Sequence, residues 1–204
     1  MSVLILDPEL AREFRDERKT RKLDRWDEVW DGVLVVAAVP NNEHQRLVSR
    51  LSVPFMAIID WDGGDQVQPG ANVSDRDKGW KKNYRIPDVL VFLKGNPAKD
   101  CITHWCGGPD LAVEIVSPGD KPKEKFAFYA KVGTRELLIV DRKPWALELY
   151  RLKEGKLQLS GRSDLANPAV LASSVLPLSF QLSASTPRPI IRIAHTTNGQ
   201  TWTA

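Results

Sequence analysis

The sequence is poor in cysteine, lacks any long apolar run and carries little net charge, and each absence excludes a class of protein. Two cysteines among 204 residues cannot supply the disulfide framework of a small secreted scaffold. No run of about 18 uncharged apolar residues occurs, so we expect no membrane span. Residues 1–25 mix acids and bases and contain no apolar core of the signal-peptide type. We therefore expect an intracellular, cytoplasmic protein.

Several common enzyme signatures are also missing. The sequence has no Gly-x-Ser-x-Gly elbow, no P-loop and no Rossmann fingerprint, which removes the enzyme classes that depend on them. Lys plus Arg exceed Asp plus Glu by 29 − 26, or +3, which neither indicates nor excludes a nucleic-acid partner. The composition, 42% hydrophobic and 27% charged, is that of an ordinary globular protein, and the length fits a single domain over 1–204.

Apolar periodicity and turn signals predict a mixed α/β domain. Asp31-Gly32 lies between two strand-like runs, a strong hairpin signal, and Asn42 is expected to cap the helix that follows. Asp120 is expected to cap a later helix, with Pro122 in its first turn and Gly133 after its end. The predicted elements are a helix over 8–22, a hairpin over 26–39, a helix over 43–59, strands over 86–92 and 110–116, a helix over 120–132, strands over 136–140 and 146–152, and short strands over 155–204.

The most informative region is 85–141, where two apolar runs contain acids. Asp88 lies in the run 86–92, and Glu114 lies in the run 110–116. Strands this apolar are usually covered on both faces of a sheet, where an ionised carboxylate is costly unless something compensates it. Because side chains alternate across a strand, Asp88 and Glu114 would converge if the two strands are neighbours in a suitable register.

Two converging carboxylates are typical ligands of a hard divalent cation. With water and a backbone carbonyl, for which Ile115 is the candidate, Asp88 and Glu114 would form part of an octahedral site for Mg²⁺ or Mn²⁺. Such a cation lowers the pKa of a bound water and offsets charge that builds on a phosphate. A nearby lysine would orient the water or stabilise the developing charge. These residues therefore predict hydrolysis of a phosphodiester.

Proline-aspartate at a strand start, an acid on the next strand and a later lysine form a pattern that resembles the PD-(D/E)XK nuclease superfamily. Within it, the chain is similar to a bacterial family of Uma-type restriction endonucleases, over roughly residues 26–152. The resemblance rests on Glu28 with Asp31-Gly32, Pro40 with His44, 85–89, 108–118, Glu124-Lys125 with Tyr129-Ala130, and 133–141. It implies an α/β, restriction-endonuclease-like fold with a mixed central sheet flanked by helices, an N-terminal hairpin and a β-rich C-terminal extension. It also implies metal-dependent cleavage of DNA.

One position departs from the superfamily pattern. The pattern has a lysine two residues after the second acid, and here that residue is Val116. The resemblance implies that Lys125, on the next helix, supplies the ammonium group, with Lys121 and Lys123 as competitors. Lys121 is expected on the same helical side as Lys125, so the two could serve one phosphate. If no lysine reaches the acids, the chain would bind metal without efficient cleavage.

Four further residues are candidates for supporting roles. Glu28 on the hairpin and Glu43 on the following helix compete as a third acid of the site. His44 could contact a substrate phosphate, or it could simply be exposed or capping at the helix start. Asp110 shares the strand face of Glu114 but lies at the strand entrance, and we interpret it as structural.

Two other motifs are weaker. Residues 101–106, Cys-Ile-Thr-His-Trp-Cys, offer three closely spaced zinc ligands without a second cluster, so we do not expect zinc. The segment 77–85 is basic and contains two aromatic residues. It fits either a solvated loop or a segment that follows a phosphate backbone and stacks a base.

The sequence thus predicts a magnesium-dependent, DNA endonuclease-like protein. Asp88, Glu114 and the Ile115 carbonyl would hold the cation, and Lys125 would activate water or steady the scissile phosphate. One alternative is a nucleic-acid-binding or regulatory module that keeps the fold without turnover, and another is a structural protein whose acids form internal ion pairs. A homodimer would bring two active sites to a duplex, but no residue requires one.

Overall fold

The centre of the structure is a mixed sheet into which both acid-bearing segments fold. The computed structural model describes residues 3–37, 39–117 and 119–204. The central sheet has the strand order β13-β12-β11-β10-β7-β4, and its described pairings are antiparallel except that of β10 with β11. The strands are β4 (Gln66–Pro69), β7 (Val89–Phe92), β10 (Leu111–Ile115), β11 (Glu136–Arg142), β12 (Trp145–Lys153) and β13 (Lys156–Asp164).

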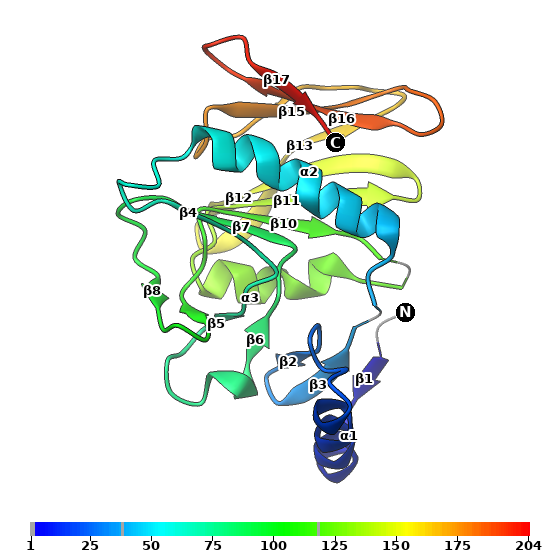
Figure 1. Cartoon of the computed structure of the whole chain (residues 1–204), viewed down its shortest axis with the longest axis vertical. Coiled ribbons are helices and arrows are strands. Elements are labelled where there is room, and N and C mark those ends of the chain that lie inside the picture. Colours follow the sequence, from blue (N-terminus) through cyan, green and yellow to red (C-terminus); the bar gives the residue numbers. More distant parts are fainter. Residues whose placement is uncertain (1–2, 38, 118) are drawn as a thin grey trace.

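Both faces of this sheet are covered, because its strands send apolar side chains to both sides. On one face Val89 and Val113 pack with residues of the helix α2 (Asn42–Ile58). On the other face Leu90 and Ala112 pack with residues of the short helix α3 (Phe126–Lys131). Figure 1 shows α2 and α3 on opposite sides of the central strands. This layering is the one that the run of buried residues in β7 and β10 requires.

A second sheet is built largely from the N-terminal part of the chain and has the strand order β1-β3-β2-β6-β5-β9-β8. The turn between β2 and β3 is Asp31-Gly32, and both residues have positive φ, 47° and 93°, as a two-residue hairpin turn demands. The helix α1 (Pro8–Thr20) buries Ala11 against this sheet. The strands are β1 (Val3–Ile5), β2 (Glu28–Trp30), β3 (Val33–Val36), β5 (Val73–Ser74), β6 (Tyr84–Arg85), β8 (Lys99–Asp100) and β9 (Trp105–Cys106).

A third sheet at the C-terminus packs onto α2 and the central sheet. Its order is β14-β15-β16-β17, and the ring of Phe180 on β15 meets the ring of Phe55 on α2 edge-on, with centroids 6.2 Å apart. Buried residues of this sheet, of α2 and of the central sheet form one continuous cluster. The C-terminal extension is therefore part of the hydrophobic core of the domain. The strands are β14 (Leu171–Ala172), β15 (Leu178–Ser183), β16 (Ile190–His195) and β17 (Thr201–Thr203).

The predicted fold class is confirmed, with one residue's difference at the start of α2. The N-cap is Asn41 rather than Asn42, since the Asn41 side chain accepts a hydrogen bond from the His44 backbone N–H at 2.9 Å. A cap must keep extended backbone while its side chain reaches the third helical N–H, and Asn41 is the residue that does so. Ala38 in the predicted strand 33–39 and Pro118 in the motif 108–118 lie outside the described residues.

The predicted helix over 120–132 is wrong in its first half. It divides into a 3-10 helix, η2 (Pro122–Lys125), followed by α3, and the residue at the N-cap of η2 is Lys121, without a side-chain capping bond. The Asp120 carboxylate instead accepts the Ser117 backbone N–H at 3.0 Å. A 3-10 turn is tighter than an α-helix, so the lysines of this segment do not share one helical face.

In the described part of the chain, no helix combines the length and the apolar character needed to cross a membrane.

Removal of Leu138 should cost stability without reaching the acidic face of the sheet. Leu138 is fully buried on the α2 face, whereas its neighbours Leu137 and Ile139 belong to the α3 face. We expect Leu138→Ala to lower the free energy of unfolding by about 2–5 kcal/mol, measured by urea denaturation. The exposed Leu159→Ala should change it by less than about 0.5 kcal/mol. Equal effects of the two variants would contradict the assignment of Leu138 to the core.

Candidate active site

The register between β7 and β10 brings the two predicted acids to the same place. Val113 pairs with Val89, so extension of the antiparallel register by one residue sets Asp88 opposite Glu114. Directly opposed residues point to the same face, here the α3 face that holds Ala112 and Leu90. The Asp88 carboxylate also accepts the backbone N–H of Ile115 at 2.7 Å. This bond fixes Asp88 beside the end of β10.

Lys125 reaches the buried acid from η2. Its Nζ lies 3.0 Å from Glu114 Oε1 and 3.1 Å from Glu114 Oε2. The same Nζ lies 3.0 Å from Oε1 of Glu28, which β2 of the N-terminal sheet supplies. One ammonium group therefore joins two carboxylates from two different sheets. Lys125 lies eleven residues after Glu114. In the superfamily pattern the lysine lies only two residues after the acid.

The two glutamates have further fixed donors. The hydroxyl of Tyr129, on α3, donates a short hydrogen bond to Glu114. Glu28 accepts the backbone N–H of Ile86 at 2.8 Å and the indole N–H of Trp30 at 2.7 Å. Ile86 lies two residues before Asp88, so Glu28 also holds the segment that leads into the first acid. These donors leave the two carboxylates little freedom to rotate.

His44 stands beside Asp88 at the start of α2. Its Nε2 lies 3.2 Å from Asp88 Oδ1, and the histidine is buried, which excludes the interpretation that it is merely exposed at a helix end. Its Nδ1 is buried and has no hydrogen-bond partner among the described residues. Asn41 caps the helix through the His44 backbone N–H, so the cap and the Asp88 contact together set the position of the imidazole.

These side chains line one cavity of about 300 Å³. Asp88, Glu114 and Glu28 face it together with Lys125 and His44. Ile115, the predicted carbonyl ligand, also lines it. The structure thus gathers every residue predicted for cation binding and cleavage in one place. Their chemical roles stay predictions.

Burial and crowding of charge shift the acid–base properties of the site. Burial raises the pKa of Glu114 to about 7; Lys125 opposes this rise, while Glu28 and Asp88 add to it. Burial alone would also raise the pKa of Glu28, but Lys125 and the Ile86 and Trp30 donors outweigh it and lower this pKa. Burial acts to lower the pKa of Lys125, but Glu114 and Glu28 raise it above its usual value. Lys125 is therefore a permanent cation, and Glu114 is the acid whose ionisation is least supported.

The rival lysines pair with other acids. Lys121 lines the same cavity, but its side chain is exposed and pairs with Glu124 at 3.1 Å, and Lys123 pairs with Glu148 at 3.3 Å. The expectation that Lys121 shares a helical side with Lys125 is wrong, because η2 is a 3-10 turn that begins after Lys121.

The rival acids are occupied by structural partners. Glu43 on α2 pairs with Arg142 at 3.1 Å, whereas Glu28 lines the cavity and contacts Lys125, so of the two rivals Glu28 is the candidate third acid. Asp110 is buried and accepts the Leu93 backbone N–H and the Arg135 guanidinium, each at 2.8 Å. These contacts tie the loop after β7 to the start of β11.

The sequence analysis gave no role to two contributors to the site. Tyr129 belongs to the motif pieces that carry the family resemblance, and in the structure its hydroxyl donates to Glu114. Arg85 lies buried, with its guanidinium over the Trp30 and Phe128 rings at 4.8 and 4.3 Å, and donates to the Val29 carbonyl at 2.9 Å. It thereby fastens the β2–β3 hairpin to α3. The one sequence feature that could have indicated a role for Arg85 is its place at the start of the motif 85–89.

The charge count of the cavity fits an additional cation. The carboxyl groups of Asp88, Glu114 and Glu28 surround the ammonium group of Lys125, and these side chains are only 14%, 10%, 6% and 15% exposed. Asp120, Glu124 and Lys121 also line the cavity, so acidic side chains outnumber lysines there. An excess of negative charge in so buried a place is costly. Carboxylate and carbonyl oxygens are the ligands that Mg²⁺ and Mn²⁺ prefer, so the donor set matches a hard cation.

Comparison with known proteins agrees with this geometry. The family model described as Uma2, "Putative restriction endonuclease", matches residues 13–185, and the chain belongs to this family. The crystal structure of "a putative nuclease belonging to DUF820" from Anabaena variabilis is similar with a TM-score of 0.57 and 16% sequence identity. The similarity covers 72% of this chain and 80% of that chain, and it supports the nuclease-like fold. No curated protein matches the chain.

The raised pKa of Glu114 predicts a pH-dependent stability that glutamine should abolish. Because its folded pKa of about 7 exceeds the ordinary 4.5, the folded state binds the proton more tightly, and its stability falls as pH rises through this window. We expect the unfolding free energy of Glu114→Gln, relative to wild type, to increase between pH 5 and 7 by up to about 1.4 kcal/mol per pH unit. Urea denaturation at several pH values measures it.

The exposed Glu13→Gln serves as the control and should follow the wild-type pH dependence. A stability difference between Glu114→Gln and wild type that stays constant from pH 5 to 8 would contradict the raised pKa.

Proposed function

We propose that this protein is a divalent-metal-dependent phosphodiesterase that cleaves DNA as an endonuclease. The single observation that carries the proposal is the contact of Lys125 with Glu114 inside a cavity that also holds Asp88. This is the acid–acid–lysine set of the PD-(D/E)XK pattern, assembled although the lysine is absent from its usual place in the sequence. Membership of the Uma2 family supports a nucleic-acid substrate.

Asp88 and Glu114 are the proposed ligands of Mg²⁺ or Mn²⁺, with the Ile115 carbonyl as a third. When bound, the cation would polarise the scissile phosphate and acidify a coordinated water. Asp88 lines the cavity, and the Ile115 N–H and His44 already fix the position of its carboxylate. We assign His44 as a positioning residue that holds this carboxylate.

Lys125 has the properties of a group that steadies charge on the attacked phosphate. Its raised pKa keeps it protonated, so it acts as a fixed cation and not as a general base. Glu28 holds the ammonium from the other side, at 3.0 Å, which limits the rotation of a side chain that is otherwise flexible. Glu28 is thus a positioning residue for Lys125. Hydrolysis would proceed by in-line attack of water without a covalent intermediate on the protein.

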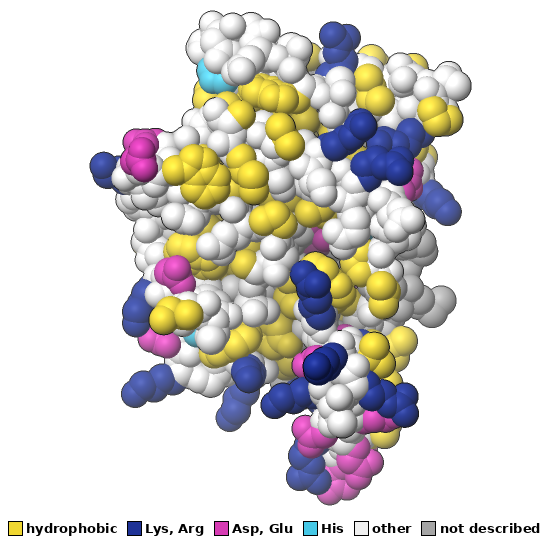
Figure 2. All heavy atoms as spheres, viewed as in Figure 1, with side chains coloured by type: hydrophobic (Ala, Val, Ile, Leu, Met, Phe, Trp, Pro, Cys, Tyr) yellow, Lys and Arg dark blue, Asp and Glu magenta, His cyan; other side chains and the backbone are white. Residues whose placement is uncertain are grey.

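A basic surface supports a polyanionic substrate. Arg15, Arg76, Lys81 and Lys82 line a second hollow, beside the β2–β3 turn. Figure 2 shows Lys and Arg side chains along the lower part of the molecule, toward α1. Such cations bind a phosphate backbone without regard to base sequence. The predicted base stacking by the segment 77–85 has less support, because Trp80 lies stacked on His104, 4.8 Å between ring centroids.

The alternative function is a nucleic-acid-binding module that keeps the fold without turnover. Its motivation was the valine at the usual lysine position. The placement of Lys125 against Glu114 supplies the missing ammonium group and favours the enzyme. The two functions differ in one measurable property, the cleavage of DNA in the presence of Mg²⁺ or Mn²⁺.

Loss of either acid should remove both metal binding and cleavage. We expect wild type to bind Mn²⁺ in calorimetric titration and to nick supercoiled plasmid with Mg²⁺ or Mn²⁺. Asp88→Asn and Glu114→Gln should lose detectable binding and reduce nicking by at least about 100-fold. The exposed Asp62→Asn should match wild type. Binding without nicking in wild type would favour the non-catalytic module, and no binding at all would remove the metal site.

Replacement of Lys125 should separate cleavage from metal binding. We expect Lys125→Met to retain Mn²⁺ affinity, or to increase it, because the ammonium that competes for Glu114 is gone. Nicking should fall by about 10²–10³-fold, the loss typical of one removed charge-stabilising donor. Lys123→Met, whose lysine pairs with Glu148 outside the cavity, is the matched control and should cleave normally. Normal cleavage by Lys125→Met would remove the lysine from the mechanism.

A further inference from the structure

A short hairpin away from the acidic cavity presents two cysteines and a histidine on one face. Strands β8 and β9 pair antiparallel, with Lys99 opposite Cys106 and the Cys101 N–H bonded to the His104 carbonyl at the tip. Residues that oppose each other, and those two apart on a strand, point to the same side. The side chains of Lys99, Cys101, His104 and Cys106 therefore share one face.

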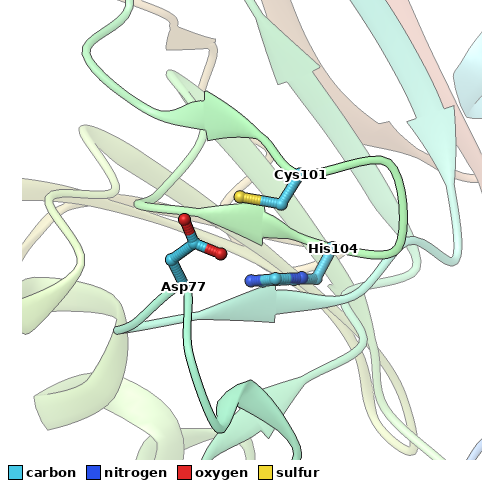
Figure 3. Close-up of side chains that lie close together, drawn as sticks. All are labelled: Asp77, Cys101 and His104. Atoms are coloured by element: carbon cyan, nitrogen blue, oxygen red, sulfur yellow. The ribbon is translucent and has the colours of Figure 1, made fainter.

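A fourth residue reaches this face from a distant segment. Asp77 belongs to the loop after β5, and its carboxylate, the Cys101 sulfur and a His104 ring nitrogen all lie within 4.8 Å of one another. Figure 3 shows the three side chains converging on one point from the hairpin and from the adjacent loop. The sequence pattern offered only closely spaced ligands within 101–106. The fold supplies the acid that the motif lacked.

We infer that Asp77, Cys101 and His104 form a zinc site separate from the acidic cavity. Thiolate, imidazole and carboxylate are the ligands that Zn²⁺ binds at about 2.0–2.3 Å, whereas Mg²⁺ disfavours sulfur and nitrogen. Tetrahedral bonds of that length need ligand atoms about 3.3–3.8 Å apart, so a small rotation of the exposed Asp77 and the half-buried Cys101 side chains closes the site around the buried His104. These side chains would supply three of the four tetrahedral ligands, and a water would supply the fourth. The expectation of no zinc, drawn from ligand spacing alone, is thereby revised.

The surroundings of the histidine suit a zinc ligand. One face of its ring stacks on Trp80, with an interplanar angle of 13°, which fixes the plane of the imidazole. Its Nδ1 lies 3.1 Å from the Thr103 hydroxyl, and its Nε2 lies 3.1 Å from the Arg76 carbonyl. A zinc-binding histidine usually donates its second ring N–H to an oxygen, and Thr103 provides that acceptor while Nε2 exchanges its carbonyl contact for zinc.

Lys99 is the group that zinc must displace. Its Nζ lies 2.9 Å from Asp77 Oδ2, and its side chain is 68% exposed, so it can move into solvent when a cation takes its place. The lysine therefore competes with zinc for the carboxylate. Its removal should strengthen zinc binding, a result that a merely structural cluster would not give.

Zinc at this position would fasten the loop that carries the basic surface. Asp77 begins the segment that continues through Trp80, Lys81 and Lys82, and both lysines line the basic hollow. A bond from Asp77 to the hairpin would hold that segment against β9. The inferred site is thus a structural clip for a surface that we assign to the nucleic acid, and its existence does not depend on cleavage.

Metal titration of the reduced full-length protein tests the site. We expect one Zn²⁺ per chain at this site, a raised melting temperature with zinc, and a thiolate charge-transfer band when Co²⁺ is used as the probe. Cys101→Ser and Asp77→Asn should weaken Zn²⁺ binding by at least about tenfold and remove the band or the temperature shift. Lys99→Ala should bind Zn²⁺ more tightly than wild type.

Two controls keep the inference separate from the nuclease proposal. Cys106→Ser, which changes the thiol outside the triad, should bind Zn²⁺ like wild type. The doubly substituted Asp88→Asn, Glu114→Gln protein should keep the Zn²⁺ stoichiometry of this site and the Co²⁺ band. No Zn²⁺ bound by that double variant, Zn²⁺ bound equally by Cys101→Ser, or equal losses in Cys106→Ser and Cys101→Ser would overturn the assigned ligand set.

Discussion

The site depends on one ammonium group that two buried carboxylates share. Lys125 lies at 3.0 Å from both Glu114 and Glu28, and these two acids come from different sheets. Without the lysine, two ionised glutamates would face each other while both are buried, which is costly. Lys125 forms an ion pair with both glutamates. Asp88 adds a further carboxylate, so the cavity has more negative than positive charge. The same arrangement therefore stabilises the fold around the site and keeps it receptive to a further cation.

The support around this group follows from the layered fold. Antiparallel pairing of β7 with β10 aligns Asp88 and Glu114, and α3 covers that face so that Tyr129 can donate to Glu114. The β2–β3 hairpin contributes Glu28, and Arg85 fastens the hairpin by lying between two aromatic rings. Each contact is ordinary in kind. Their convergence on one cavity of about 300 Å³ gives a polar centre in an otherwise apolar part of the sheet.

Much of this could be predicted from residue patterns, and what could not has a physical reason. The alternation of β7 and β10 was sufficient to predict that Asp88 and Glu114 share a face once the strands are neighbours. The position of Lys125 needed the family resemblance, because spacing alone left Lys121 and Lys123 open. The 3-10 form of η2, which decides between them, depends on how the segment after β10 packs. Side chains that meet from segments distant in sequence, such as Glu28 with Lys125 and Asp77 with Cys101, have no local signature.

The sharing of Lys125 by two sheets has a consequence for the newly made chain. Glu28 is synthesised early and Lys125 about a hundred residues later, yet each needs the other in its buried position. Until the N-terminal hairpin has docked beneath α3, the lysine lacks one of its two anchors and the cavity lacks one wall. A half-folded polypeptide would therefore lack a complete cavity. The proposed cleavage would have to wait until the tertiary structure is complete.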